Sequence, residues 1–209
     1  MRNHNIENTK LVARWLGTGS INIFGMPFAG KDTQGKKLAE IFHAPLLGGG
    51  DILRSDHMSE RIKQLMTTGK LIPSDDYVSI VLPYLSREEF KDKPLILSSV
   101  GRWQGEEASV LEVTAAANHP LRVAVYLKLD EAIVGARWQI AHIQKDRGIR
   151  KDDAAHSLLI RLDEFYKKTV PVIDFYRNRG MLVEIDGQDS PDTVTDNILS
   201  SLAGYAKKS

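Results

Sequence analysis

The stretch that decides the fold runs from residue 21 to residue 34 and reads Ile21-Asn22-Ile23-Phe24-Gly25-Met26-Pro27-Phe28-Ala29-Gly30-Lys31-Asp32-Thr33-Gln34. A short run of β-forming residues leads into the spacing G-x-x-x-x-G-K, and helical spacing follows over residues 33–42. In a loop of this kind, backbone N–H groups and the N-terminus of the next helix surround a phosphate chain. The pattern therefore predicts a phosphate-binding loop, in which glycines allow the turn and Lys31 reaches the outer phosphates.

The specificity of this loop signal depends on its context. At an average glycine usage of about 7%, two glycines and a lysine occur at this spacing by chance in about one chain in twenty. The competing interpretation is a pair of turn glycines beside a surface lysine. Because the loop stands directly between an apolar strand and a helix, the context favours the phosphate site.

Three further short apolar runs indicate strands, and longer stretches with helical spacing separate them. The strand runs are 95–97, 123–126 and 182–185, and the helical stretches are 106–117, 131–143, 153–166 and 191–205, with several helices expected over 51–90. Pro171 is suited to open one more helix and Gly180 to end it. Strands that do not alternate between apolar and polar residues favour a parallel sheet. We therefore expect one α/β domain, with helices on both faces of a parallel sheet and ligands at the carboxyl ends of its strands.

The amino-acid composition excludes several kinds of site and partner. The chain has 209 residues, of which 42% are hydrophobic and 26% charged, and its formal net charge is +1. The absence of cysteine excludes a disulfide framework, a Cys-ligated zinc or iron–sulfur site and a thiol nucleophile. The near-neutral charge argues against a nucleic-acid partner, and without a run of 18 apolar residues we expect no membrane partner. The composition therefore predicts a cytoplasmic globular protein.

The N-terminal segment predicts a short amphipathic helix over residues 6–16, with Ile6, Leu11, Val12 and Trp15 near one face. It is too polar for the apolar stretch of a signal peptide. We expect the helix to pack on the edge of the domain, and a contact with a membrane or a partner is the alternative.

The segment GMPFAGKDTQGKKLAEIF, residues 25–42, resembles the opening of adenylate kinases, whose loop reads G-x-P-G-x-G-K-G-T-Q. The resemblance continues in the same order over about residues 21–203. Each later piece is weak alone, but the set is specific. The pieces are Gly50-Asp51-Ile52-Leu53-Arg54 for G-D-M-L-R, Gly69-Lys70-Leu71-Ile72-Pro73 for G-K-L-V-T/P, Arg150-Lys151-Asp152-Asp153 with Arg161-Leu162 for R-x-D-D and R-L, Thr169-Val170-Pro171-Val172-Ile173 with Tyr176 for T-x-P-[LV]-I-x-x-Y, and Ile185-Asp186-Gly187 for the closing V/I-D-G.

The resemblance implies a nucleoside monophosphate kinase with a P-loop fold. Such an enzyme reversibly moves a phosphoryl group from Mg·ATP to AMP, or to a related nucleoside monophosphate, and forms two nucleoside diphosphates. The expected parts are a core at about 19–48, 82–136 and 153–209, a flap over the monophosphate at about 49–81, a short closing lid at about 137–152 and an N-terminal extension at 1–18. Mg²⁺ with ATP is the implied cofactor, zinc is not expected because the lid lacks cysteine, and we expect a monomer.

Arginine suits phosphoryl transfer because its planar fork binds phosphate oxygens through two hydrogen bonds and stays charged. A lone helical arginine is more commonly a solvated side chain, so the following roles rest on the resemblance. The implied catalytic residues are Lys31, Arg102, Arg137, Arg150 and Arg161. The implied ATP-binding residues are Gly25, Phe28, Ala29, Gly30, Lys31, Asp32, Thr33 and Arg137, and the implied monophosphate-binding residues are Gly49, Arg54, Leu71, Ile72, Gly101, Arg102, Glu106, Arg150 and Arg161.

Two departures from the family pattern concern the donor side. Phe28 stands where the loop normally has glycine, and we expect a negative φ there with an altered loop rim. Ser98 stands where the family has an aspartate that helps to hold hydrated Mg²⁺. We hypothesise that Asp32, directly after Lys31, replaces the lost carboxylate at the Mg²⁺ site. The alternative is that Asp32 only stabilises the N-terminus of the following helix.

Two further departures concern the acceptor base. Gly49 replaces a threonine, and Glu106, with Gln104 nearby, replaces the glutamine that reads the edge of adenine in the family. A carboxylate only accepts hydrogen bonds, so it suits a base edge that presents donors, such as that of guanine. Two other functions stay open: a P-loop kinase of another small acceptor, and a nucleotide-binding module without catalysis, which Ser98 and Phe28 motivate.

Overall fold

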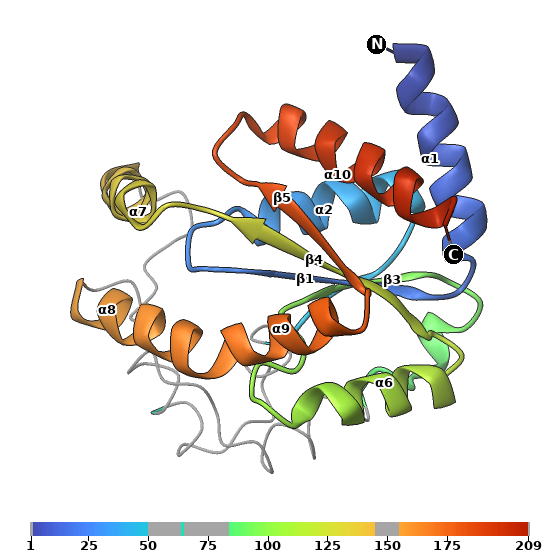
Figure 1. Ribbon diagram of the computed structural model, residues 1–209, viewed down its shortest axis with the longest axis horizontal. Coiled ribbons are helices and arrows are strands. Elements are labelled where there is room, and N and C mark those ends of the chain that lie inside the picture. Colours follow the sequence, from blue (N-terminus) through green and yellow to red (C-terminus); the bar gives the residue numbers. More distant parts are fainter. Residues whose placement is uncertain (1, 50–63, 65–83, 145–154, 209) are drawn as a thin grey trace.

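The computed structural model describes residues 2–49, 64, 84–144 and 155–208 (Figure 1). Four residues of the predicted site, Arg54, Leu71, Ile72 and Arg150, lie outside these ranges, as do nearly all of the predicted flap and the second half of the predicted lid.

The centre of the molecule is a five-stranded sheet in which every pairing is parallel, in the order β2-β3-β1-β4-β5. The strands are β1 (Ser20–Gly25), β2 (Leu46–Gly48), β3 (Leu95–Ser98), β4 (Leu121–Lys128) and β5 (Leu182–Asp186). The predicted parallel α/β sheet and four of its strands are confirmed. The sequence did not predict β2, because three residues are too few to show a periodic pattern.

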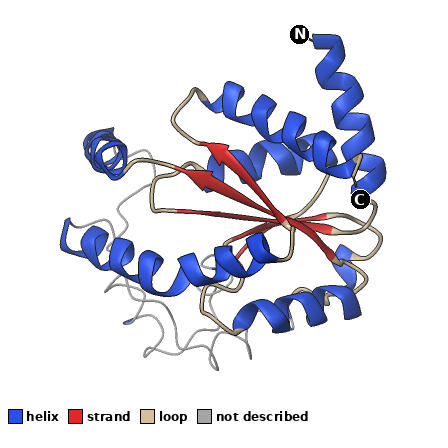
Figure 2. Ribbon diagram, viewed as in Figure 1, coloured by secondary structure: helices blue, strands red, loops and turns tan. Residues whose placement is uncertain are grey.

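Helices cover both faces of the sheet, as predicted (Figures 1 and 2). On one face lie α1 (Arg2–Leu16), α2 (Lys31–Phe42) and α10 (Pro191–Ala206), and on the other lie α6 (Glu106–Ala116) and α9 (Val170–Asn178). Two more helices, α7 (Glu131–Gln144) and α8 (Ala155–Glu164), lie toward the carboxyl ends of the strands, and Glu88–Phe90 forms a short 3-10 turn. Among the described residues, no helix is long and apolar enough to cross a membrane.

The core is built around the central strand β1, in which every residue is buried. Its apolar side chains Ile21, Ile23 and Phe24 have no exposed surface, and the ring of Phe24 packs against Tyr176 of α9 with 5.8 Å between ring centroids. A strand flanked on both sides and covered on both faces favours apolar residues, and any polar side chain in it needs a hydrogen-bond partner. This buried strand leads directly into the phosphate-binding loop, so the loop starts from a rigid element.

The predicted N-terminal helix is α1, which packs against α10 through buried Val12 and Leu16 and an edge contact between Trp15 and Tyr205. The prediction that Ile6 shares the packed face is wrong, since 52% of Ile6 is exposed. The reason is visible in Figure 1, where the first turns of α1 project beyond the end of α10.

The expectation that Pro171 opens a separate helix is also wrong in part. From Ala155 to Asn178 the chain stays helical, because a π-helical turn at Phe165–Thr169 joins α8 directly to α9. Proline lacks an N–H, and its ring collides with the carbonyl four residues earlier in a regular α-helix. The wider turn just before Pro171 accommodates both defects. Gly180, with φ 65°, follows the end of α9 as predicted.

Candidate active site

The predicted phosphate-binding loop connects β1 to α2 at the carboxyl end of the central strand. A Cβ on Gly25 would lie 3.0 Å from the Ala29 side chain and 3.0 Å from the backbone oxygen of Leu127, so a larger residue would fit only if these neighbours moved by a few tenths of an ångström. Gly30 has φ 93°, a conformation that glycine adopts without steric cost. Both positions therefore favour glycine, Gly25 through its close neighbours and Gly30 through its backbone angle, and the loop places the N-terminus of α2 at the site.

Lys31 begins α2 and turns back across the loop. Its Nζ donates hydrogen bonds of 2.8 Å to the backbone oxygens of Gly25 and Met26. The ammonium group is half-buried and fixed at the mouth of the loop, where a phosphate chain would enter. Asp32 and Thr33 follow in the first turn of α2, half-buried and exposed respectively.

Phe28 corrects our expectation of a negative φ, because its φ is +62°. The loop has a left-handed backbone at this position, at a steric cost of about 1–2 kcal/mol for a residue with a side chain. The ring is only 6% exposed, and the Arg161 guanidinium carbon lies 5.8 Å from its centroid. Burial of a large aromatic ring thus holds an unfavourable backbone conformation in place.

A cavity of about 280 Å³ lies beside the loop, between α2, α7 and the start of α10. Arg137 of α7 lies on its wall and donates to the backbone oxygens of Phe28 (3.3 Å), Gly187 (2.8 Å) and Gln188 (3.2 Å). The arginine therefore joins α7 to the loop after β5. Five of the predicted ATP-binding residues line this cavity, which we therefore call the donor cavity: Phe28, Ala29, Gly30, Thr33 and Arg137.

A second, smaller cavity lies at the loop and brings predicted catalytic residues together. Lys31, Arg102 and Arg161 all line it, from α2, the loop after β3 and α8. We call it the transfer cavity. Its remaining lining residues are Gly25, Pro27, Glu164, Phe165 and Thr169. Arg137 lines the donor cavity instead, and Arg150 lies outside the described residues.

The loop that carries Arg102 is braced from the sheet. Asn22, fully buried in β1, donates from Nδ2 to the backbone oxygen of Val100 (2.7 Å) and accepts from its N–H at Oδ1 (3.2 Å). Gly101 follows with φ 70°, and a Cβ there would lie 2.7 Å from the Val110 side chain. The sequence analysis did not predict a role for Asn22. A single amide within an apolar strand is nevertheless a signal, because its buried polar groups must bond to a neighbouring segment.

Replacing Asn22 by leucine is expected to lower the free energy of unfolding by about 2–4 kcal/mol, because both backbone groups of Val100 lose their partner inside the protein. The Michaelis constant for the acceptor is expected to rise as well, because Arg102, a predicted monophosphate-binding residue, lies two residues after Val100 in the same loop. Urea unfolding and steady-state kinetics measure the two effects. The matched control is Asn197→Leu, on the exposed side of α10. A change in Asn22→Leu of less than about 0.5 kcal/mol would show that the brace carries no stability.

Glu106, the predicted base reader, begins α6 and is 2% exposed. Its Oε2 accepts hydrogen bonds from the backbone N–H groups of Arg102 (2.7 Å) and Trp103 (3.0 Å). One carboxylate oxygen therefore fixes the loop that presents Arg102. Gln104, the neighbouring candidate, is exposed, and Gly49 is buried directly after β2.

Few carboxylates near the loop, among those that the structure describes, are available to hold Mg²⁺. Strand β3 ends at Ser98, which is 9% exposed, and within the described part of the chain no three His, Asp or Glu side chains gather closely enough to hold a metal ion. Kinases bind Mg²⁺ mainly through substrate phosphates and water, with one or two carboxylates. Asp32, next to Lys31 in the first turn of α2, lines neither cavity but is a carboxylate beside the loop, and one such carboxylate is enough for an ion that is held mainly by ATP.

Tyr166 supports the loop from outside and was not predicted from the sequence. Its hydroxyl lies 3.4 Å from the sulfur of Met26, which is buried in the loop. Burial raises the pKa of Tyr166 to about 12, and a hydrogen bond with Glu131 contributes to the rise. Tyr166 therefore lies between Met26 of the loop and Glu131 at the start of α7.

A phosphate-binding loop at the carboxyl edge of a parallel sheet, with a lysine and two arginines in one cavity, defines a P-loop phosphotransferase. The adenylate kinase family model matches residues 23–181, and the chain belongs to the adenylate kinase family. It is therefore an ATP-dependent phosphotransferase of the nucleoside monophosphate kinase type.

Several named relatives agree with this family. The chain is 30% identical to an adenylate kinase of Methanosarcina mazei, over 90% of this chain and 100% of that protein, and 31% identical to one of Methylorubrum populi, over 90% and 98%. Among solved structures, a gluconokinase from Sinorhizobium meliloti 1021 superposes with a TM-score of 0.63 at 18% identity, over 91% of this chain and 95% of that one. The latter likeness concerns the fold alone.

Proposed function

We propose that this protein reversibly transfers a phosphoryl group from Mg·ATP to a nucleoside monophosphate, with AMP as the favoured acceptor, and releases two nucleoside diphosphates. The observation that carries this proposal is the transfer cavity, in which Lys31, Arg102 and Arg161 converge beside the phosphate-binding loop. Transfer between two polyanions depends mainly on positioning and on positive charge around the moving group.

The two cavities suggest how the substrates are arranged. The donor nucleotide would occupy the 280 Å³ cavity beside Arg137, with its phosphates on the loop between Gly25 and Lys31. The acceptor phosphate would lie on the Arg102 side of the transfer cavity. Lys31 lines the transfer cavity and would stabilise the charge that develops on the transferring group. Arg161 would contact the same group from α8.

Mg²⁺ bound with ATP would neutralise part of the charge on the donor phosphates. The residue that would hold it, together with those phosphates, is Asp32. Asp32→Asn is expected to raise the Mg²⁺ concentration needed for half-maximal activity by about tenfold, and to weaken Mg²⁺-dependent binding of ATP measured by calorimetry. The matched control is Glu40→Gln, on the exposed side of α2. If Asp32→Asn showed the wild-type Mg²⁺ requirement in both measurements, the carboxylate would only stabilise the helix N-terminus.

The acceptor base is tested by offering AMP, GMP, CMP, UMP and dTMP separately with Mg·ATP and measuring the diphosphate formed. We expect turnover with AMP. A preference for GMP that Glu106→Gln reverses would instead assign base reading to the Glu106 carboxylate, which suits a base edge with donors. No transfer to any acceptor, with ATP still bound, would refute the proposed function in favour of a silent nucleotide-binding module. A monomeric state and a cytoplasmic location stay predictions.

A further inference from the structure

One carboxylate lies among the cations of the transfer cavity. Glu164, the last residue of α8, lines this cavity with Lys31, Arg102 and Arg161, and its side chain is only 12% exposed. A site for phosphate oxygens gains nothing from a negative charge of its own. The carboxylate repels an incoming phosphate, and it attracts the cations that would otherwise bind the phosphate. Its presence therefore needs a physical reason.

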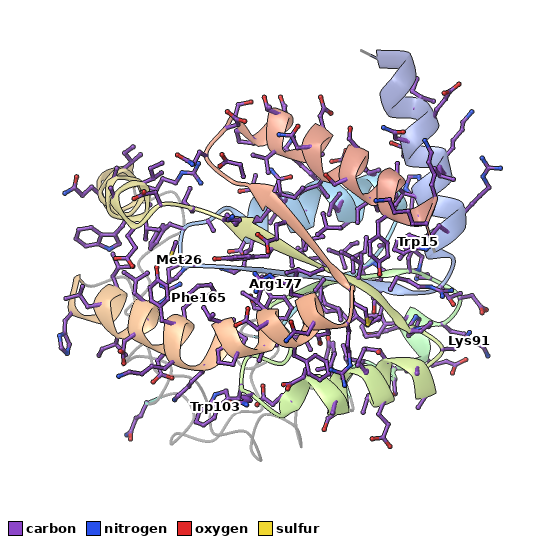
Figure 3. All side chains as sticks on the ribbon, in the orientation of Figure 1. Trp15, Met26, Lys91, Trp103, Phe165 and Arg177 are labelled. Carbon is purple, nitrogen blue, oxygen red and sulfur yellow. The ribbon has the colours of Figure 1, made fainter. Side chains whose placement is uncertain are left out.

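Lys168 pairs with this carboxylate. Its Nζ lies 2.6 Å from Glu164 Oε2, and the lysine side chain is 25% exposed. The same Nζ lies 3.8 Å from the centroid of the Trp103 ring, and Figure 3 shows Trp103 beside the start of α6. An ammonium over an indole face is attracted by the ring, more strongly where water is partly excluded. The lysine is thus held at Glu164 by two interactions.

The π-helical turn at Phe165–Thr169 explains this arrangement. In a regular α-helix, the cavity-facing series that starts at Arg161 and Glu164 would continue to residue 168. The extra residue in the wide turn places Thr169 in the cavity wall instead. Lys168 then lies to the side, against Trp103, while it still reaches Glu164. The same turn lets the Thr169 hydroxyl donate to the backbone oxygen of Arg102 (3.3 Å).

The pair is also connected to the acceptor side of the site. Trp103 directly follows Arg102, and Glu106 holds the backbone N–H groups of both residues. Lys168 therefore contacts the segment that presents Arg102, as well as the carboxylate that shares the transfer cavity with it.

We propose that Glu164 is an internal counter-anion of the transfer cavity, and that Lys168, held on Trp103, sets how strongly Glu164 competes with phosphate. Without substrate, the carboxylate balances cations that would otherwise repel one another. Lys168, which already pairs with Glu164 in this structure, neutralises part of the carboxylate charge, so that Glu164 opposes an incoming phosphate less. Glu164 thereby limits the affinity of the cavity for phosphate and favours release of the product, and Lys168 sets how large this effect is. This inference rests on the proposed function only for the identity of the nucleotide that carries the phosphate.

The test measures binding of inorganic phosphate to the whole protein by calorimetry, without nucleotides, in four proteins: wild type, Glu164→Gln, Lys168→Met and the double variant. Glu164→Gln is expected to bind phosphate about tenfold more tightly, because a repulsive charge is removed. Lys168→Met keeps the aliphatic stem on Trp103 but leaves Glu164 without its neutralising charge, and is expected to bind about tenfold more weakly. The double variant is expected to resemble Glu164→Gln within about twofold, because Lys168 has no effect once its partner is neutral.

A neighbouring ion pair supplies the control. Asp163 and Lys167 form a pair of the same spacing on the same helix, at 2.8 Å, with both side chains exposed. Asp163→Asn and Lys167→Met are expected to leave phosphate binding unchanged within about twofold. Wild-type or weaker binding by Glu164→Gln would overturn the proposal, as would a double variant that binds as weakly as Lys168→Met. If the expected order appears in a protein that phosphorylates no nucleoside monophosphate, the proposed function fails while this inference stands.

Discussion

Replacing Lys31 by methionine is expected to lower kcat by about a thousandfold. The ammonium of Lys31 is fixed at the loop mouth by the backbone oxygens of Gly25 and Met26, and it lines the transfer cavity beside Arg102 and Arg161. Removing one prearranged group that stabilises a developing charge costs about a hundredfold to a thousandfold. Methionine keeps most of the aliphatic stem, so the change removes the charge and little packing. A coupled assay of diphosphate formation measures the effect.

The control for this variant is Lys36→Met, because Lys36 is an exposed lysine on the same helix, and it is expected to keep wild-type kinetics within about twofold. Thermal unfolding should show that Lys31→Met is folded, with a small loss of stability from the two lost hydrogen bonds. Binding of ATP should weaken much less than kcat falls, since the loop N–H groups remain. A loss of kcat below about tenfold would show that transfer does not take place beside this loop.

The sequence predicted the features that depend on local patterns. The order of strand, glycine-rich loop and helix is contiguous, so the positions of Gly25, Gly30 and Lys31 followed from spacing alone, and the buried runs predicted four of the five strands. Arg102 and Arg161 are 59 residues apart in the chain. They share a cavity only because the fold places the loop after β3 and helix α8 at the same edge of the sheet (Figure 1). Spacing could not have paired them, and the resemblance to a known family did.

The sequence did not predict features in which one residue changes the local backbone. A regular period of 3.6 residues places residue 168 on the cavity side of its helix, and only the π-helical turn moves Thr169 there. Pro171 predicted the start of a separate helix, because the π-helical turn that lets the helix continue through it has no simple signature in the sequence. The partnership of Asn22 with Val100 spans 78 residues and is likewise invisible to local patterns.

Phe28 was also predicted wrongly, and its left-handed backbone leads to the second large expected effect. Restoring the family glycine by Phe28→Gly is expected to lower the free energy of unfolding by about 2–4 kcal/mol. Relief of the left-handed backbone returns about 1–2 kcal/mol, and the flexibility of glycine in the unfolded chain removes part of that gain. Loss of a buried phenyl ring costs about 3–5 kcal/mol, so burial outweighs strain.

The comparison with Phe28→Ala separates the two contributions. Alanine loses the same ring but keeps a Cβ at φ +62°, so this variant is expected to be less stable than Phe28→Gly by about 1 kcal/mol. At a φ that is negative, as we first expected, alanine would instead be the more stable of the two, because glycine loses more entropy on folding. The order of stability of the two variants, measured by urea unfolding, therefore shows whether φ at position 28 is positive or negative. If Phe28→Gly were as stable as the wild type, the ring of Phe28 would have to lie outside the core, against its 6% exposure.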